Sequence, residues 1–216
     1  VEEIKRYRIS SLEPDLLSDD LIEYCAHSRA FMPHFHIPLQ SGSDAVLKLM
    51  HRRYDSALFA HKIRLIKKFM PDAFIGVDVM VGTRGETPEL FEETYEFLKG
   101  LDVTHLHVFP YSERPGTAAL RIPYVVADKD KKLRSKRLLD MSDEKQHAFY
   151  ASYIGTEAEV LFEKAPKGKA MHGFTKNYVR VELPAALSSD ELDNQLVMVR
   201  LSDFNHDKSA LKCEII

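Results

Sequence analysis

Cysteine is nearly absent from this sequence, since its 216 residues contain only Cys25 and Cys213. The two cysteines lie far apart and show no metal-binding spacing, so we assign no metal ligands in the chain. Sparse cysteine is typical of a reducing compartment, and we expect a cytoplasmic protein. The sequence also lacks a signal peptide and any run of about 18 apolar residues, so we expect neither export nor a membrane partner.

An excess of positive charge is missing as well, because 33 acidic residues balance 30 lysines and arginines, for a net charge of -3. This balance argues against a protein that coats nucleic acid nonspecifically, so any basic surface must be local. Hydrophobic residues make up 44% of the chain, which is enough for a globular core. The chain starts at Val1, only a few residues before a strand pattern, and we therefore expect a piece of a longer protein.

Four segments rich in apolar and β-branched residues are predicted to be strands, and a helical pattern follows each of them. The segments are 7–12, 35–40, 74–81 and 105–111. Ser18 and Thr87 are expected to be helix N-caps, and Pro88 suits a first helical residue. Strand–helix repeats of this length favour a parallel sheet. A closed parallel barrel commonly has about eight such units, so four predict half a barrel or an open sheet.

The second half of the chain predicts a different architecture. Residues 125–154 form one long, highly charged helical pattern, which we expect to link two domains. Beyond Gly155, short alternating segments predict a small all-β barrel. They are 156–164, 177–184, 195–204 and 210–216. We therefore expect an α/β domain with its linker helix over residues 1–154 and a β domain over residues 155–216.

Polar residues gather where the predicted strands end. In parallel α/β proteins, ligands bind beyond the carboxyl ends of the strands. Four such clusters in succession predict a binding site at this rim, although the residues alone do not identify its ligand. The clusters are Ser10, Ser11 and Glu13; Gln40 to Asp44; Gly82, Gly85 and Glu86; and Tyr111 to Arg114 with Gly116.

Two pairs of histidines have the spacing of possible strand ligands. His34 and His36, like His105 and His107, are two residues apart and would point to the same side of a strand. No third ligand stands near either pair in the sequence. We therefore interpret all four as core or strand-end histidines rather than as a metal site.

Five motifs occur in an order that resembles the radical S-adenosylmethionine (SAM) methylthiotransferases. They are "RISSLEP", "HIPLQSGSDAVLKLMHRRY", "VDVMVGTRGET", "HVFPYSERPGTAA" and, in the β domain, "GFTKNYVRVEL". The resemblance covers nearly the whole chain. It implies an α/β fold that is the carboxyl half of a radical SAM (partial TIM-type) barrel, followed by the family's RNA-binding TRAM domain, an OB-like β-barrel. The tRNA-modifying branches fit the motifs better than the branch that modifies a ribosomal protein.

Within the tRNA branches, "SSLEP" and "HVFPYSERPGT" look most like enzymes that convert N6-threonylcarbamoyladenosine, beside the anticodon, to its 2-methylthio form. The branch that acts on isopentenyladenosine usually differs at both places. The resemblance therefore implies a parent enzyme that uses SAM and two [4Fe–4S] clusters and binds the anticodon arm of tRNA. The alternatives are a relative that acts on isopentenyladenosine or a ribosomal protein, and an RNA-binding module without catalytic activity.

The resemblance also assigns residues to SAM. Gln40 and Ser41 at a strand end, Arg52 in the following helical pattern and Asp78 on the next strand match positions that hold SAM in such barrels. An arginine suits the methionyl carboxylate, whereas Gln40 and Asp78 suit hydroxyl or amine groups. The alternative interpretation is a surface arginine, a strand-end glutamine and an aspartate that caps a helix.

For the substrate, we expect Glu13, Arg84 and Arg114 to act at the rim. Arg84 stands where the family often has proline, which would leave a basic side chain free to meet an anion. In the β domain, Lys176, Tyr178 and Arg180 belong to a basic and aromatic stretch without an intervening acid, a composition that suits single-stranded RNA. The basic run at 129–137 is an alternative phosphate contact, although a solvated helix face explains it equally well.

The sequence departs from the family at the iron–sulfur sites. The thiolates at CxxxCxxC spacing that hold a [4Fe–4S] cluster with one open iron are absent, as are the cysteines of the family's amino-terminal domain. We therefore expect this chain alone to be inactive and assign it no catalytic residue. The missing amino-terminal part of the same protein is an expected partner, and an exposed half barrel predicts self-association.

Overall fold

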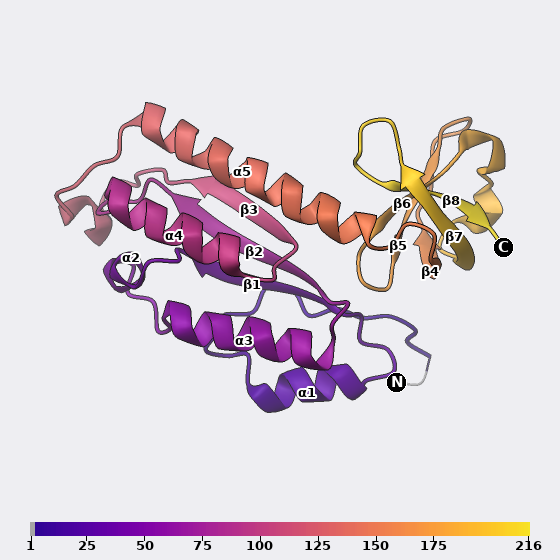
Figure 1. Ribbon diagram of the computed structural model, residues 1–216, viewed down its shortest axis with the longest axis horizontal. Helices are drawn as coiled ribbons and strands as arrows, with labels where there is room; N and C mark the ends of the chain where they lie inside the picture. Colours follow the sequence, from indigo (N-terminus) through magenta and orange to yellow (C-terminus); the bar gives the residue numbers. More distant parts are fainter. Residues whose placement is uncertain (1–2) are drawn as a thin grey trace.

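In the computed structural model, which describes residues 3–216, an open parallel sheet and a small β-barrel are joined by one long helix (Figure 1). The sheet has the order β1-β2-β3, with all strands parallel. Its strands are β1 (His34–Gln40), β2 (Phe74–Val81) and β3 (His105–Pro110). The three corresponding sequence predictions are therefore confirmed to within one residue at each end.

Helices cover one face of this sheet (Figure 1). They are α1 (Asp19–His27), α2 (Asp44–Leu49), α3 (Ser56–Phe69), α4 (Pro88–Gly100) and α5 (Asp128–Ala151), with a 3₁₀ turn at Ala118–Arg121. The predicted N-caps are confirmed, because the Ser18 side chain accepts a hydrogen bond from the Leu21 amide and the Thr87 side chain accepts one from Leu90. Pro88 is the first residue of α4, where its missing N–H costs nothing.

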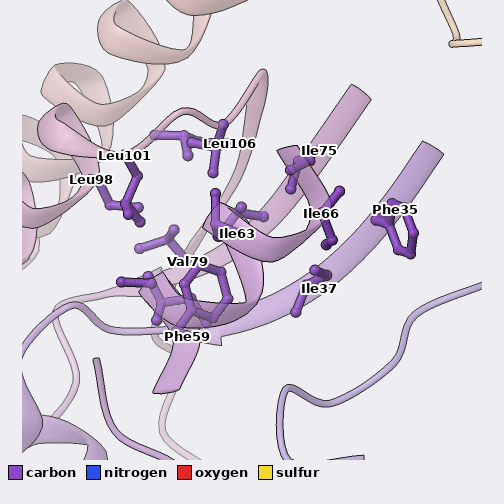
Figure 2. Packing of buried hydrophobic residues seen from close by; sticks show 14 of the residues in the cluster. Phe35, Ile37, Phe59, Ile63, Ile66, Ile75, Val79, Leu98, Leu101 and Leu106 are labelled. Carbon is purple, nitrogen blue, oxygen red and sulfur yellow. The ribbon is translucent and has the colours of Figure 1, made fainter. Parts of the chain in front are cut away.

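The main core lies between the sheet and these helices. Alternate side chains of each strand point into it, including Phe35 and Ile37 of β1 and Leu106 of β3. Phe59, Ile63 and Ile66 of α3 pack on them, as Figure 2 shows, and each of these three side chains is at most 1% exposed. The opposite face of the sheet carries the other set of side chains, several of which are half-buried or exposed; Phe109 there is 51% exposed, whereas Phe74 is buried against the barrel.

The predicted strand at residues 7–12 is not a regular strand. The segment runs beside β1 but pairs with its surroundings only at isolated bridges, Tyr7 with Phe31 and Ser11 with His36. The Tyr7 amide donates to the Ala30 carbonyl, and the Leu12 amide donates to the His36 carbonyl. The residues between these points form no ladder. The pattern of alternating side chains therefore predicted an extended segment correctly and a continuous strand incorrectly.

The carboxyl-terminal part forms a closed barrel with the strand order β4-β5-β6-β8-β7. The strands are β4 (Glu157–Phe162), β5 (Met171–Thr175), β6 (Arg180–Leu183), β7 (Leu196–Phe204) and β8 (Leu211–Ile215), with 3₁₀ turns at Ala185–Leu187 and Asp190–Leu192. Sequence reasoning did not identify β5. Phe74 of β2 and Tyr150 of α5 are buried in the same cluster as the barrel residues, so the core of the barrel continues into the α/β part. Within residues 3–216, no helix combines the length and the apolar character that a membrane span needs.

The barrel lies at the amino ends of the parallel strands (Figure 1). The Asn177 side chain donates a hydrogen bond to the Asp72 carbonyl, two residues before β2, and the Arg6 guanidinium donates to the carbonyls of Phe174 and Glu159. The predicted rim lies at the other end of the strands. Because the eight residues of β2 extend over about 26 Å, the length of the sheet separates the barrel from the rim.

Candidate cofactor and RNA sites

Gln40 ends β1 in a strained conformation. Its φ of 70° lies in the left-handed region, and the register of β1 with β2 shifts between Pro38 and Gln40. A residue with a side chain rarely adopts this conformation, and such strain is often concentrated at ligand-binding positions. The turn places the half-buried Gln40 side chain at the carboxyl end of the sheet. This geometry is compatible with the expected role of Gln40, which stays a prediction.

The turn that follows is fixed to α4. The Ser41 hydroxyl is fully buried, lies 3.0 Å from the Thr94 hydroxyl and accepts a hydrogen bond from the Ser43 amide. Ser43 in turn donates to a carboxylate oxygen of Glu93 at 2.6 Å. Ser41 therefore shapes the turn through its interior contacts, and its hydroxyl is not directed to a ligand. Any contribution of Ser41 to SAM binding would come from its backbone.

Arg52 and Glu13 form an ion pair at the same end of the sheet. The Arg52 Nη1 atom donates to a Glu13 carboxylate oxygen at 2.9 Å, and the two side chains are 28% and 38% exposed. Both residues line a cavity of about 270 Å³. The Arg52 Nε atom is buried and has no hydrogen-bond partner. Because an unpaired buried donor is costly, this side chain has unused capacity for an anionic ligand.

Asp78 lies on the exposed face of the sheet beside two histidines. Its Oδ1 atom is 2.6 Å from Nε2 of His36, and the His36 and His107 rings stack with centroids 4.9 Å apart. Donor atoms of these three residues lie within 4.8 Å of one another. The expectation that the histidines have no third ligand nearby is therefore wrong. Burial lowers the pKa of His107, and burial likewise lowers the pKa of His105 to about 4.

Arg84 is not the free side chain that the sequence predicted. Its Nε atom donates to a Glu113 carboxylate oxygen at 2.7 Å, and Nη1 donates to the carbonyls of Leu120 and Ile122 at 3.0 Å. The Arg84 hydrogen bond holds the pKa of the Glu113 carboxyl below its usual range. Arg84 therefore fixes the loop after β3, on which Arg114 stands exposed. Anion binding by Arg84 and Arg114 stays a prediction.

The predicted RNA-contacting residues have different surroundings in the barrel. Lys176 is 64% exposed, and its Nζ lies 4.0 Å from a carboxylate oxygen of Asp72, whereas Arg180 is half-buried. The Tyr178 ring stacks on Phe174 with centroids 4.5 Å apart and an interplanar angle of 13°. The Arg8 guanidinium lies 4.3 Å from the centre of the Tyr178 ring. Tyr178 therefore packs at the junction of the two parts, and base stacking on it stays a prediction.

The residues present fit SAM better than they fit an iron–sulfur cluster. The unpartnered Arg52 Nε and the strained Gln40 leave polar groups at the rim that a SAM carboxylate and hydroxyls would satisfy. Cys25 and Cys213 instead are buried in separate hydrophobic clusters. Burial raises the pKa of both thiols, that of Cys213 to about 12. Because cluster ligands must be thiolates at one site, these cysteines do not hold a cluster.

Comparisons with known proteins decide the family. Residues 1–98 match the radical SAM superfamily. Over 205 residues the chain is 37% identical to the threonylcarbamoyladenosine tRNA methylthiotransferase MtaB of Bacillus subtilis, and this alignment covers 93% of the chain and 45% of that protein. The chain belongs to the radical SAM methylthiotransferase family. A further member, the tRNA-2-methylthio-N(6)-dimethylallyladenosine synthase of Thermobifida fusca, is 37% identical over 161 residues, covering 74% of the chain and 33% of that protein.

This radical SAM methylthiotransferase chain spans less than half the length of the curated relatives it matches. A solved structure supports the fold independently. Coproporphyrinogen III oxidase (HemN) from Escherichia coli, a radical SAM enzyme, aligns with a TM-score of 0.52 at 17% identity and covers 79% of this chain and 46% of that chain. The likeness supports a shared radical SAM fold.

Proposed function

We propose that this chain supplies the SAM-binding and tRNA-binding parts of a cytoplasmic enzyme that methylthiolates C2 of N6-threonylcarbamoyladenosine beside the anticodon. The observation that carries the proposal is the 37% identity to the Bacillus subtilis methylthiotransferase, which extends over both the sheet and the barrel. Bound SAM and a [4Fe–4S] cluster would supply the radical chemistry. The cluster ligands would come from another part of the parent protein, so the chain alone is expected to be inactive.

At the rim, Arg52 would bind the methionyl carboxylate, and Gln40 would bind a ribose hydroxyl or the amine of SAM. Arg52 already pairs with Glu13 through Nη1, and its side chain is 28% exposed, so a ligand could reach the guanidinium; the buried, unpartnered Nε would gain a contact only if the side chain turned. Glu13 would then orient the guanidinium rather than contact the cofactor. Asp78 is the remaining candidate for a SAM hydroxyl or amine, although its carboxylate is engaged with His36.

The tRNA would extend along the sheet. We take residues 155–216 to be a TRAM domain whose Lys176 and Arg180 contact phosphates at the amino end of the strands. The modified adenosine would reach the rim at the other end, where Arg114 is exposed. Since about 26 Å of sheet separates the two ends, one nucleotide cannot contact both. The proposal therefore needs a stem held by the barrel and a loop held by the rim.

The Arg52→Ala variant is expected to bind SAM about 10- to 100-fold more weakly than the wild-type chain, because one charge-assisted hydrogen bond contributes about 1.5–3 kcal/mol. Calorimetric titration of the purified chain with SAM measures this. Arg64→Ala is the matched control, since Arg64 is exposed on α3 away from the rim. Equal affinities for the two variants, or no SAM binding by the wild-type chain, would show that the rim alone forms no SAM pocket.

An anticodon stem-loop that carries threonylcarbamoyladenosine is expected to bind this chain more tightly than an unmodified stem-loop. The Lys176→Ala/Arg180→Ala double variant should weaken binding of both and lower the slope of log affinity against log salt by about one for each phosphate that the protein no longer neutralises. Fluorescence anisotropy across a salt series measures both effects. A Lys129→Ala/Lys132→Ala variant removes the same charge from exposed positions on α5 and serves as control.

Three outcomes of this experiment separate the alternatives. A preference for a loop with isopentenyladenosine would assign the chain to that branch of the family instead. Equal, salt-sensitive binding of all loops would leave only a phosphate-binding module. An unchanged salt slope in the Lys176 and Arg180 double variant, with a lowered slope in the control, would move the RNA contact from the barrel to α5.

A further inference from the structure

Neighbouring strands bring three metal-ligand side chains together on the exposed face of the sheet. His36 is on β1, Asp78 on β2 and His107 on β3. Asp78 and His107 are direct partners in the register of β2 and β3, and His36 lies opposite Gly76, two residues before Asp78. Their donor atoms lie within 4.8 Å of one another. The pairing of the strands thus brings the Asp78 carboxylate near both His36 and His107, although the three residues are far apart in the sequence.

The sheet also leaves room for these side chains to converge. Gly76 on β2 pairs with His36 of β1 and with His105 of β3, and a Cβ atom there would lie 3.4 Å from Nε2 of His107. This is a tight contact, so the glycine keeps the space above the strand open for the imidazole. The His36 and Asp78 side chains are 31% and 18% exposed. The cluster is therefore sheltered but open to solvent on one side.

We propose that His36, Asp78 and His107 bind one divalent first-row transition-metal ion, with Zn²⁺ or Fe²⁺ as the best chemical match. Two imidazoles and one carboxylate on one side of an ion form a facial triad, which leaves coordination positions open to water or a substrate atom. Imidazole and carboxylate together suit these ions better than Mg²⁺ or Ca²⁺, which prefer oxygen ligands alone. The set contains no thiolate, so these three residues would not ligate a [4Fe–4S] cluster of the type expected for the family.

Metal binding would require small movements of the three side chains. Zn²⁺ binds nitrogen and carboxylate oxygen at about 2.0–2.2 Å, which places the donor atoms of a tetrahedral site about 3.3 Å apart. The His36–Asp78 distance of 2.6 Å is that of a hydrogen bond, so the ion would replace the shared proton and widen this pair. Because the three donor atoms lie within 4.8 Å of one another, the widest pair would have to shorten by no more than about 1.5 Å, which rotation of the side chains can provide.

His105 is excluded from the set by its own contacts. Its Nδ1 atom lies 3.1 Å from the Ser142 hydroxyl, and its ring meets His107 edge-on with centroids 4.6 Å apart. It therefore contacts His107 without belonging to the triad, and an exposed histidine elsewhere is the suitable control for the loss of an imidazole.

The inference does not depend on SAM binding. Asp78 is a candidate contact in both proposals, but metal binding is measured without SAM or RNA. A chain that binds metal and not SAM would retain the metal site and lose the proposed cofactor role of Asp78. A chain that binds SAM and no metal would retain the proposed cofactor role of Asp78 and would overturn the metal site. Addition of SAM to the metal-loaded chain would show whether the two compete for Asp78.

Titration of the wild-type chain with Co²⁺ and Zn²⁺, followed by visible absorption and calorimetry, is expected to give one ion per chain. The His107→Ala and Asp78→Asn variants should each bind at least about 100-fold more weakly, since even outer-shell changes cost about 10- to 100-fold. His61→Gln, which removes an exposed imidazole on α3 far from the three ligands, should keep wild-type affinity. Substoichiometric binding, or equal affinity in the ligand variants and the control, would overturn the proposal.

A second measurement covers the case in which a ligand variant fails to fold. Imidazole resonances of the wild-type chain, recorded by NMR during the Zn²⁺ titration, should shift for His36 and His107 and not for His172, which pairs with Glu182 in the barrel. Shifts confined to His172 or to exposed histidines such as His61 would place the ion elsewhere and also overturn the proposal.

Discussion

Replacing Arg134 by alanine is expected to lower the free energy of unfolding by about 3–5 kcal/mol, because it leaves a buried carboxylate without its partner. Arg134 on α5 donates to Oε2 of Glu86 at 2.5 Å and to the Glu86 carbonyl at 2.9 Å. The side chains are 7% and 0% exposed. The Gly82 amide also donates to Glu86, so this pair fixes the loop that begins at the carboxyl end of β2.

The pH dependence of this loss identifies its cause. Burial raises the pKa of the Glu86 carboxyl above its ordinary value of 4.5, and the Gly82 amide and Arg134 counteract the rise. Without Arg134 the pKa rises further, and a raised carboxyl pKa means that stability is greatest at low pH and falls as pH rises through the folded-state pKa. The difference in free energy of unfolding between the wild-type chain and Arg134→Ala should therefore be largest near neutral pH and should shrink toward pH 4.5. Urea unfolding at several pH values would measure it.

Arg137→Ala is the matched control, because Arg137 on the same helix pairs with Glu92 at the surface. An exposed pair contributes about 1 kcal/mol or less, so this variant should remain near wild type. The double variant Glu86→Leu/Arg134→Met should be more stable than Arg134→Ala, since it removes the charge together with its partner. A loss no larger for Arg134→Ala than for Arg137→Ala would contradict a structural role for the buried pair.

Local signals in the sequence were sufficient wherever neighbours along the chain determine the structure. Thr87 and Pro88 define the start of α4 through contacts within one turn, and the apolar run of β2 gives its limits. The segment 7–12 has the same kind of pattern but only isolated bridges to its surroundings. A ladder depends on the partner strand as well as on the segment, and the pattern of one segment carries no information about its partner.

The sequence pattern did not reveal β5, because this strand contains Gly173. Glycine weakens the pattern that is typical of a strand, but the fold requires it at this position. Gly173 lowers strand propensity, yet a Cβ at this position would lie 2.5 Å from the Leu161 carbonyl oxygen of β4. The close approach of the two strands therefore requires glycine. In the same way, the carboxylate beside His36 was not found because it comes from a position 42 residues away, which only the sheet register brings near.

Composition also could not separate a surface aromatic residue from one at a domain junction. Tyr178 belongs to a basic and aromatic stretch that predicts RNA binding, but its ring lies 4.4 Å from His34 and 5.6 Å from Phe74 in ring-centroid distance. Its φ of 68° is left-handed, which the surrounding contacts must enforce. Which side of the barrel faces the sheet is a tertiary property, and the sequence of the stretch does not contain it.

Tyr178→Ala is therefore expected to lower the free energy of unfolding by about 2–3 kcal/mol, somewhat less than truncation of a fully buried aromatic residue. The ring lies among Phe174, Arg8 and His34, so its loss weakens the junction between sheet and barrel. The wild-type chain should unfold in one transition, because the two parts share a core, whereas the variant should show separate transitions for the barrel and the sheet. Differential scanning calorimetry measures both the loss and the splitting.

Two controls distinguish junction packing from base stacking by Tyr178. Lys176→Ala, at an exposed position two residues earlier, should change stability by less than about 0.5 kcal/mol. A double-mutant cycle between Tyr178→Ala and Phe174→Ala should give a coupling of about 0.5–1.5 kcal/mol, the range for stacked aromatic pairs. If Tyr178→Ala instead leaves stability unchanged and weakens stem-loop binding by about 1–3 kcal/mol, the ring serves the RNA and not the junction. The RNA path from barrel to rim would then begin at Tyr178.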